Sequence, residues 1–276
     1  MSTTPSAVPG REWLLVNGRN VVLDRLDRRQ PVVTLGVRAA RTIDIAKTAQ
    51  LTGHHLLWID LEHSSMSIDV AAQISSACLD VGIVPIFRPP EKDYGVIGRM
   101  LDGGALGIMA ARVETPEEAA EIAAACRFPP LGRRSQIAGL PLFGMRRIPA
   151  REHNALANCS TIVKVLIETE RGIRNVEQIA AVPGVDLIGI GSNDFTAELG
   201  IPGDYHHPRV RDAYLAGIAA CRKHGKHFIV GGVADLKYQR EMWDAGAGLM
   251  IQSAIDSELM RDALQEKVSA ITAAVK

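Results

Sequence analysis

Short apolar runs alternate with helical patterns along most of the chain, and this alternation constrains the fold more than any other feature. The apolar runs are rich in Val, Ile and Leu, which favour buried strands, whereas the segments between them repeat apolar residues with a helical period. Elements in this order form parallel sheets, because each helix returns the chain to the start of the next strand. The eight strand-like runs cover residues 32–36, 55–61, 83–88, 106–110, 162–168, 187–191, 227–230 and 248–252.

The number of these units predicts a single (β/α)8 TIM barrel of the α/β class. The chain has 276 residues, and such barrels are typically built from about 250 residues as one domain. No internal repeat, low-complexity segment or Pro/Gly linker divides the sequence. We therefore expect an N-terminal extension over residues 1–30 and one barrel domain over residues 31–276.

Two of the helical segments have a recognisable end or face. Thr115-Pro116-Glu117-Glu118 is a capping box with proline at the first helical position. The last segment carries an apolar stripe that either covers the barrel or packs on a neighbouring subunit, and the sequence leaves both alternatives open. This stripe consists of Met260, Leu264, Val268, Ile271 and Val275.

Residues 128–160 form an irregular insertion between the fourth helical pattern and the fifth strand-like run. The insertion contains Pro129-Pro130 and several arginines, and an irregular segment of this length inside a domain is usually functional or disordered. Because the insertion follows a helix, we expect it at the end of the barrel opposite the catalytic loops, where it supports subunit contacts. Alternatively, its arginines bind an anionic substrate.

The balance of charges and the cysteine pattern exclude several classes of function. The 31 basic and 31 acidic residues cancel, so the sequence predicts neither a nucleic-acid surface nor an anionic-membrane surface. No apolar run approaches the ~20 residues of a membrane-spanning helix, and the N-terminus lacks the order of a signal peptide. We therefore expect a cytoplasmic protein. The four cysteines show no spacing typical of a zinc site.

Ionisable residues collect where four of the predicted strands end. The second strand ends with Asp60-Leu61-Glu62-His63, and the third ends with Arg88. Glu168 ends the fifth strand, and Asp194 follows the sixth. The carboxyl ends of the strands of a (β/α)8 barrel meet at one face, where catalytic groups lie. Since unpaired buried charges are costly, we expect these residues to form one site.

The residue types indicate the chemistry of this site. Glu168 and Asp194 suit a hard divalent cation such as Mg²⁺ or Mn²⁺. His63 can transfer a proton near neutral pH, and Arg88 can stabilise a carboxylate or an enolate oxygen. The backbone N–H groups of the turn that starts at Gly191 can bind a substrate carboxylate. Together these groups predict enolisation of a 2-oxo acid.

Each of these residues also has a purely structural explanation. A single histidine after a strand is usually a hydrogen-bonded structural residue, and a single carboxylate there often caps a helix or forms a salt bridge. The pairs His54-His55 and His206-His207 are poor metal sites, because adjacent strand residues face opposite sides. The joint placement at four strand ends is what favours an active site.

Six motifs in this order resemble those of the HpcH/HpaI aldolases, a family of class II, metal-dependent pyruvate-type aldolases. The resemblance extends over residues 34–262, which is nearly the whole predicted barrel. The motifs are Asp60-Leu61-Glu62-His63, Arg88-Pro89, Leu101-Asp102-Gly103-Gly104-Ala105, Phe128-Pro129-Pro130-Leu131-Gly132, Glu168, and the block from Gly191 to Gly200 with Asp194 and Phe195.

The resemblance implies roles for individual residues. Glu168 and Asp194 would bind the divalent metal, which is Mg²⁺, Mn²⁺ or Co²⁺. Arg88 would stabilise the enolate, and His63 would act as the base with Asp102 as its orienting partner. The pyruvate carboxylate would be bound by the backbone of Gly191, Ser192, Asn193 and Asp194.

The same resemblance implies an assembly and a reaction. Family members usually form hexamers, built as trimers of dimers, that exchange the last helix between paired subunits. We expect reversible aldol addition or cleavage between pyruvate, or a substituted 2-oxo acid, and an aldehyde through a metal-bound enolate. One alternative is a related lyase or synthase that decarboxylates oxaloacetate or uses it in a citrate-type condensation. Another is a non-catalytic barrel that binds a 2-oxo acid.

Three departures from the family pattern bear on the substrate. Leu166 stands where many members have glutamine, and it shares a strand face with Glu168. Ala111-Arg112 replaces the usual Pro-Met after the fourth strand, and Gly132-Arg133-Arg134-Ser135 replaces a Gly-x-Arg-Gly turn. These changes leave the identity of the donor and the acceptor open.

Overall fold

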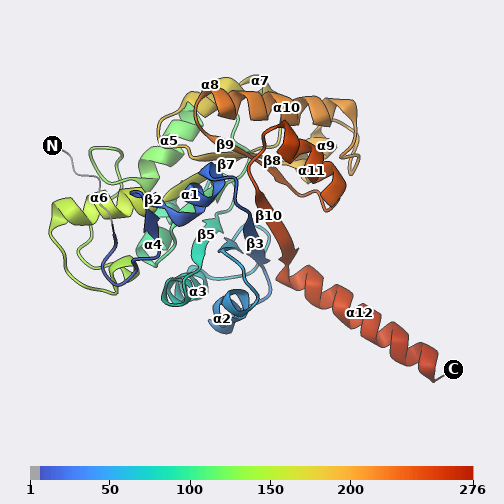
Figure 1. The fold of residues 1–276 in the computed structure, drawn as a ribbon, viewed down its shortest axis with the longest axis horizontal. Helices are drawn as coiled ribbons and strands as arrows, with labels where there is room; N and C mark the ends of the chain where they lie inside the picture. Colours follow the sequence, from blue (N-terminus) through green and yellow to red (C-terminus); the bar gives the residue numbers. More distant parts are fainter. Residues whose placement is uncertain (1–6, 276) are drawn as a thin grey trace.

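A parallel eight-stranded barrel forms the centre of the molecule in the computed structural model, which describes residues 7–275 (Figure 1). The strands follow one another around the ring, β10 pairs with β3, and β9 lies beside β10, so that the barrel is nearly closed. The TIM-barrel prediction is confirmed. The strands are β3 (Val32–Val37), β4 (Leu56–Asp60), β5 (Val84–Arg88), β6 (Gly107–Ala110), β7 (Ile162–Ile167), β8 (Leu187–Gly191), β9 (His227–Gly231) and β10 (Met250–Ile255).

Helices cover the outer faces of the strands, so the strands are buried on both sides. Such strands consist of consecutive apolar residues, as β7 does at every position except Lys164. Alternate residues of β7 face opposite directions: Val163 and Val165 pack towards the helices, and Leu166 lies inside the barrel. The helices are α2 (Asp44–Leu51), α3 (Ile68–Val81), α4 (Ile97–Asp102), α5 (Pro116–Cys126), α7 (Glu170–Arg174), α8 (Val176–Ala181), α9 (Ser192–Glu198), α10 (Pro208–Lys223) and α11 (Leu236–Ala245), with the 3-10 turn η1 (Tyr94–Val96).

Side-chain caps fix the start of helix α5. The Thr115 side chain accepts a hydrogen bond from the backbone N–H of Glu118, and Pro116 occupies the first turn. The Glu118 carboxylate in turn accepts a hydrogen bond from the backbone N–H of Glu114 at 2.9 Å. The free N–H of Glu118 in the first turn and the N–H of Glu114 just before the cap are thereby satisfied. The predicted N-cap at Thr115 is confirmed.

The N-terminal segment closes one end of the barrel. It forms β1 (Leu15–Val16), β2 (Arg19–Asn20) and α1 (Val21–Asp27). Leu14, Leu23 and Leu26 are buried in one cluster with interior barrel residues such as Leu56. This end is the amino-terminal end of the strands, because the segment leads directly into β3. Residues 1–6 of the expected N-terminal extension lie outside the described residues.

Residues 128–160 pack at the same end of the barrel. They include the 3-10 turn η2 (Pro141–Phe143) and helix α6 (Ala150–Ser160), which leads into the start of β7. Phe143 and Leu156 belong to the buried cluster that contains the N-terminal segment. The side-chain amide of Asn20 also donates a hydrogen bond to the carbonyl of Ser160 at 2.6 Å. These two segments together therefore close the amino-terminal end of the barrel.

The last helix, α12 (Asp256–Ala274), extends away from the barrel (Figure 1). None of its residues is buried, and its apolar stripe from Leu259 to Val275 is exposed, so the stripe does not cover its own barrel. Asp256 anchors the start of the helix by accepting hydrogen bonds of 2.7–3.1 Å from the backbone N–H groups of residues 38–40. No helix within residues 7–275 combines the length and apolar character that crossing a bilayer requires.

Candidate active site

A cavity of about 140 Å³ opens at the carboxyl ends of the strands and extends into the barrel. Its mouth is lined by Arg88, Glu168 and Asp194, which come from three different strand ends. Its inner part is lined mainly by apolar side chains, including those of Leu56 and Met250. Three of the residues that the sequence predicted for the site are thus brought to one cavity.

Arg88 is held in place by a buried carboxylate. Its Nε and Nη2 atoms donate hydrogen bonds of 3.0 and 2.5 Å to the two oxygens of Asp60, which is fully buried at the end of β4. Arg38 Nε donates a third hydrogen bond to the same carboxylate at 2.6 Å. Burial alone would raise the pKa of Asp60, but the two guanidinium groups, Arg88 above all, outweigh it and lower that pKa to about 2. Asp60 is therefore an anion that fixes the orientation of Arg88.

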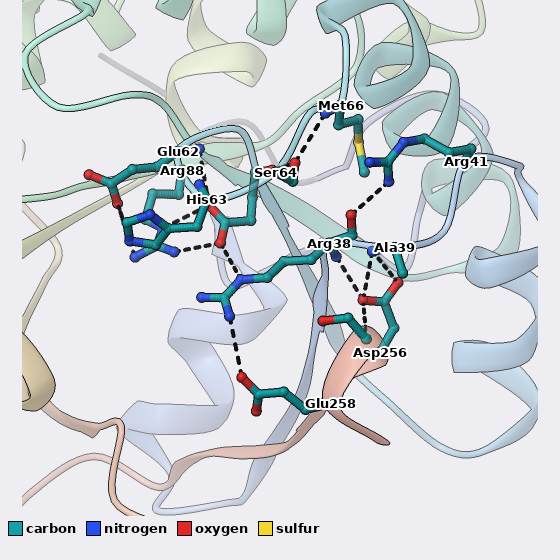
Figure 2. A network of polar contacts seen from close by, with 12 residues as sticks. Arg38, Ala39, Arg41, Glu62, His63, Ser64, Met66, Arg88, Asp256 and Glu258 are labelled. Atoms are coloured by element: carbon teal, nitrogen blue, oxygen red, sulfur yellow. Dashed lines mark hydrogen bonds and ion pairs between the residues drawn. The ribbon is translucent and has the colours of Figure 1, made fainter. Parts of the chain in front are cut away.

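Asp60 also shapes the turn that carries His63. Its carboxylate accepts hydrogen bonds from the backbone N–H groups of Glu62 and His63 at 3.1 and 3.2 Å. The Ser64 hydroxyl donates to the Asp60 carbonyl. Figure 2 shows that this turn brings His63 and Glu62 next to Arg88. One buried aspartate thus positions both the arginine and the histidine.

Glu62 connects the histidine with the arginine. Its Oε2 atom lies 3.0 Å from Arg88 Nη1 and 3.5 Å from His63 Nε2. Burial raises the pKa of Glu62, although the charge of Arg88 opposes that effect. The side chain of His63 is half exposed, so its imidazole is accessible to solvent. It does not line the cavity itself but lies beside the mouth, next to Glu62, which contacts Arg88. This position suits a group that exchanges protons with water.

Glu168 and Asp194 form a strongly anionic part of the mouth. Glu168 is buried and accepts a hydrogen bond from the backbone N–H of Arg112 at 3.0 Å. Burial, followed by the nearby charges of Asp194 and Glu62, raises the pKa of Glu168 to about 7. A Cβ atom on Gly191 would overlap the Glu168 carboxylate. Glycine is therefore needed on the neighbouring strand for Glu168 to point into the cavity.

The donor set fits a divalent cation with open coordination positions. Carboxylates that repel one another in a buried site are stabilised by a cation, and two carboxylates with water ligands suit Mg²⁺ or Mn²⁺. Within residues 7–275, no group of three or more His, Cys, Asp or Glu side chains is arranged to hold a metal ion. Glu168 and Asp194 are the two carboxylates that line this mouth and would hold the ion.

Side-chain hydrogen bonds hold the turn after β8 in place. The Ser192 hydroxyl lies 2.5 Å from the Tyr214 hydroxyl and donates to the carbonyl of Gly231 at 2.5 Å. The Asn193 side chain accepts a hydrogen bond of 2.5 Å from the Tyr205 hydroxyl. Since both side chains are engaged in these contacts, residues 191–194 present mainly backbone and Asp194 to the cavity.

Asp102 and His63 lie at opposite ends of the barrel. It is the last residue of α4, which runs back to the amino-terminal end of the strands, whereas His63 follows the carboxyl end of β4. Asp102 there pairs with Arg134 at 2.7 Å, and Arg134 stacks on the ring of Phe128 at 4.4 Å. Within one chain, the structure does not bring Asp102 to His63. A dyad between these two residues therefore requires two copies of the chain.

The cavity residues that were not singled out from the sequence include Arg38, Trp58 and Lys164. The guanidinium groups of Arg38 and Arg88 both lie over the Trp58 ring, 5.8 and 5.4 Å from its centre. Lys164 lies deeper in the barrel, on the strand face that also carries Leu166. A single charged residue in an apolar strand was a visible signal for Lys164, whereas no comparable signal marks Arg38.

Comparison with known proteins finds similarity over most of the chain. A family model described as HpcH/HpaI aldolase/citrate lyase matches residues 38–263. A 4-hydroxy-4-methyl-2-oxoglutarate aldolase of Hapsidospora irregularis is 34% identical over 232 residues, which cover 83% of this chain and 84% of that protein. A hydroxypyruvate/pyruvate aldolase of Sagittula stellata is 32% identical over 222 residues, which cover 80% of this chain and 85% of that protein.

A solved structure supports the architecture. The crystal structure of an HpcH/HpaI aldolase from Desulfitobacterium hafniense matches with a TM-score of 0.83, covering 90% of this chain and 95% of that chain. The two sequences are 24% identical, so this likeness concerns the fold alone.

Proposed function

Since the chain belongs to the HpcH/HpaI aldolase/citrate lyase family, we propose that it is a metal-dependent aldolase acting on 2-oxo acids. The reaction is the reversible addition of pyruvate, or a substituted 2-oxo acid, to an aldehyde, which makes the protein a carbon–carbon lyase. The observation that carries the proposal is the meeting of Arg88, Glu168 and Asp194 at one cavity mouth, with His63 beside it. The aldolases similar to this chain, named for 4-hydroxy-4-methyl-2-oxoglutarate and for pyruvate, agree with this reaction class.

The proposed metal ligands are Glu168 and Asp194. A divalent cation such as Mg²⁺, Mn²⁺ or Co²⁺, when bound there, would supply Lewis-acid chemistry at the 2-oxo group. The fit rests on the raised pKa of Glu168, which reflects burial and neighbouring carboxylates, and on the space that Gly191 leaves for this side chain. The backbone of residues 191–194 would bind the carboxylate of the 2-oxo acid.

In the proposed reaction, Arg88 stabilises negative charge on the substrate. Removal of a proton from the carbon next to the 2-oxo group leaves an electron pair, which delocalises onto the 2-oxo oxygen to give an enolate. Arg88 donates N–H hydrogen bonds to that oxygen. Because Asp60 holds the guanidinium through two hydrogen bonds, Arg88 needs little rearrangement when the charge develops. The enolate carbon then attacks the carbonyl carbon of the aldehyde.

His63 is the proposed base. Its imidazole accepts the proton that leaves the 2-oxo acid and returns a proton to the new alkoxide, and the half-exposed ring can exchange with solvent. Asp102 keeps its proposed role as the partner that orients His63, supplied by a second copy of the chain. The pairing of Asp102 with Arg134 would then fix the carboxylate at a subunit boundary.

We further propose a homo-oligomer in which α12 packs on a neighbouring subunit, with a hexamer built as a trimer of dimers. The support is the exposed apolar stripe on a helix that leaves its own barrel. A helix with large apolar residues on one face is stabilised when that face is covered. Small-molecule 2-oxo acids and aldehydes are the other proposed partners.

An alternative reaction uses the same enolate differently. The family description includes citrate lyase, so decarboxylation of oxaloacetate or a citrate-type condensation is the second candidate. Release of CO₂ from oxaloacetate, without any aldehyde, distinguishes this candidate from an aldol reaction.

The proposed function is tested by condensing pyruvate with a panel of short aldehydes and identifying the products by mass spectrometry. Glu168→Ala should abolish product formation, whereas Glu170→Ala, which changes an exposed carboxylate two residues further on, should leave it intact. Circular dichroism establishes that both variants are folded. Full activity of Glu168→Ala, or of the wild type in a chelator, would contradict the assignment.

A further inference from the structure

A buried lysine projects into the inner part of the cavity. Lys164 lies near the middle of β7, and its side chain shares the interior face of this strand with those of Leu166 and Glu168. The residue is only 8% exposed. Among the residues that the structure describes, none forms an ion pair or a hydrogen bond with its ammonium group.

The surroundings of Lys164 leave room for a ligand. Gly189 lies on the neighbouring strand β8, and a Cβ atom at this position would lie 3.4 Å from Lys164 Cε. Apart from the charged groups, the cavity that contains Lys164 is lined by Thr34, Gln252 and mainly apolar side chains. These apolar residues include Leu56, Ile86, Met109, Leu166, Ile229 and Met250. The cavity is continuous from this inner end to Glu168 and Asp194 at the mouth.

The charge of Lys164 is uncompensated in the ligand-free protein. Burial, together with the repulsive charge of Arg88, lowers its pKa to about 8. Glu168 stands four residues further along the same strand face, and among the described residues no ion pair joins its carboxylate to Lys164. An unpaired cation in apolar surroundings destabilises a fold, so an anion that enters the cavity would relieve that cost.

We propose that Lys164 binds a second carboxylate of the substrate and that the enzyme therefore acts on dicarboxylic 2-oxo acids. This inference builds on the proposed function, in which the first carboxylate and the 2-oxo group are bound at the mouth. The carboxylate of a simple 2-oxo acid would be bound by residues 191–194, so Lys164 is free for another anionic group. A carboxylate fits better than a phosphate, because the inner end offers a single cation and phosphate sites usually combine several donors.

The test is a calorimetric comparison of two ligands that differ at one end. In 2-oxoglutarate a carboxylate occupies the end of the chain, and in 2-oxopentanoate a methyl group takes its place. The wild type in Mg²⁺ should bind 2-oxoglutarate more tightly. Lys164→Met should weaken the binding of 2-oxoglutarate by roughly 10- to 100-fold, which is the range for a hydrogen bond between charged groups. The affinity for 2-oxopentanoate should stay unchanged. Lys237→Met removes an exposed lysine and should affect neither ligand.

The replacement is designed to keep the fold. Methionine has a similar length and removes a buried charge without leaving a charged partner behind. Equal losses of affinity for both ligands, or no loss for either, would overturn the proposal. Reductive trapping of 2-oxopentanoate on Lys164 with borohydride would also overturn it, because the amine would then act as a nucleophile.

A separate measurement distinguishes a wrong lysine assignment from a wrong proposed function. Exchange of the methyl protons of pyruvate with deuterated water reports on enolisation and involves no second carboxylate. If the wild type shows no exchange, the proposed function fails while the calorimetric comparison still tests the lysine; if exchange is normal and the comparison fails, only the lysine assignment is wrong.

Discussion

Replacing Lys164 with methionine should stabilise the ligand-free protein at neutral pH. Folding lowers the pKa of this lysine from 10.5 to about 8, through burial and then through the charge of Arg88. One pKa unit corresponds to ~1.36 kcal/mol, so the charged lysine costs roughly 3 kcal/mol of unfolding free energy at pH 7. Methionine carries no such cost and fills a similar volume.

The sign of this effect depends on pH. Between pH 8 and pH 10.5 the unfolded chain binds more protons at Lys164 than the folded chain does, so wild-type stability rises with pH in this window. Lys164→Met lacks this contribution. The advantage of the variant should therefore be largest below pH 8 and disappear as the pH approaches 10.5.

The assay is urea denaturation of both proteins at pH 7 and at pH 10, at equal protein concentration because oligomers unfold in a concentration-dependent manner. The difference between the two proteins isolates the lysine from other groups that titrate at high pH. A variant that is less stable than the wild type at pH 7, or a difference that does not change with pH, would refute the reasoning.

Three further changes have defined outcomes. Gly191→Ala should displace the Glu168 carboxylate and weaken Mn²⁺ binding by roughly 10- to 100-fold in calorimetry; unchanged affinity would contradict the ligand assignment. Asp60→Asn frees Arg88 and should lower kcat by about 100-fold. Because the pKa of Asp60 is lowered to about 2, the stability it contributes is present above pH 3.8 and lost towards pH 2, so the denaturation curves of the wild type and of Asp60→Asn should converge there. Leu264→Asp with Ile271→Asp should reduce the oligomer in analytical ultracentrifugation, and an unchanged mass would argue against packing through α12.

Most of the fold could be predicted because the strands are buried on both faces. A strand such as β8, Leu187–Gly191, is an uninterrupted small or apolar run, and its predicted range is the observed one. The course of α12 could not be predicted in the same way. Its stripe of large apolar residues fits the surface of its own barrel and that of a neighbour equally well, so the pattern alone does not choose between them.

The location of the site was predictable, but its internal contacts were not. Parallel strands place their carboxyl ends on one face, which is sufficient to bring Arg88 and Glu168 to one cavity. The interaction of Arg38 with Asp60 depends on the barrel geometry: Arg38 follows β3 and reaches the end of the neighbouring strand β4. Figure 2 shows that Arg38 also contacts Glu258, at 3.3 Å, which links the site to α12.

Motifs identify residues without giving their positions in space. The motif around Asp102 predicts a partner for His63, yet α4 carries this aspartate to the opposite end of its own barrel. The proposed dyad therefore depends on assembly. Lys164 is the reverse case: the sequence displays a charge within an apolar strand, but only the structure shows that no carboxylate of residues 7–275 forms an ion pair with it.

Enolisation of a 2-oxo acid in this cavity, with the help of a divalent metal, can be observed by NMR of pyruvate in deuterated water. We expect exchange of the methyl protons with Mg²⁺ or Mn²⁺, no exchange in a chelator, and strong losses in Arg88→Ala and His63→Ala. The measurement needs no assumption about the aldehyde. Exchange that persists in the chelator, or that Arg88→Ala leaves unaffected, would contradict the account, as would the absence of exchange with every metal.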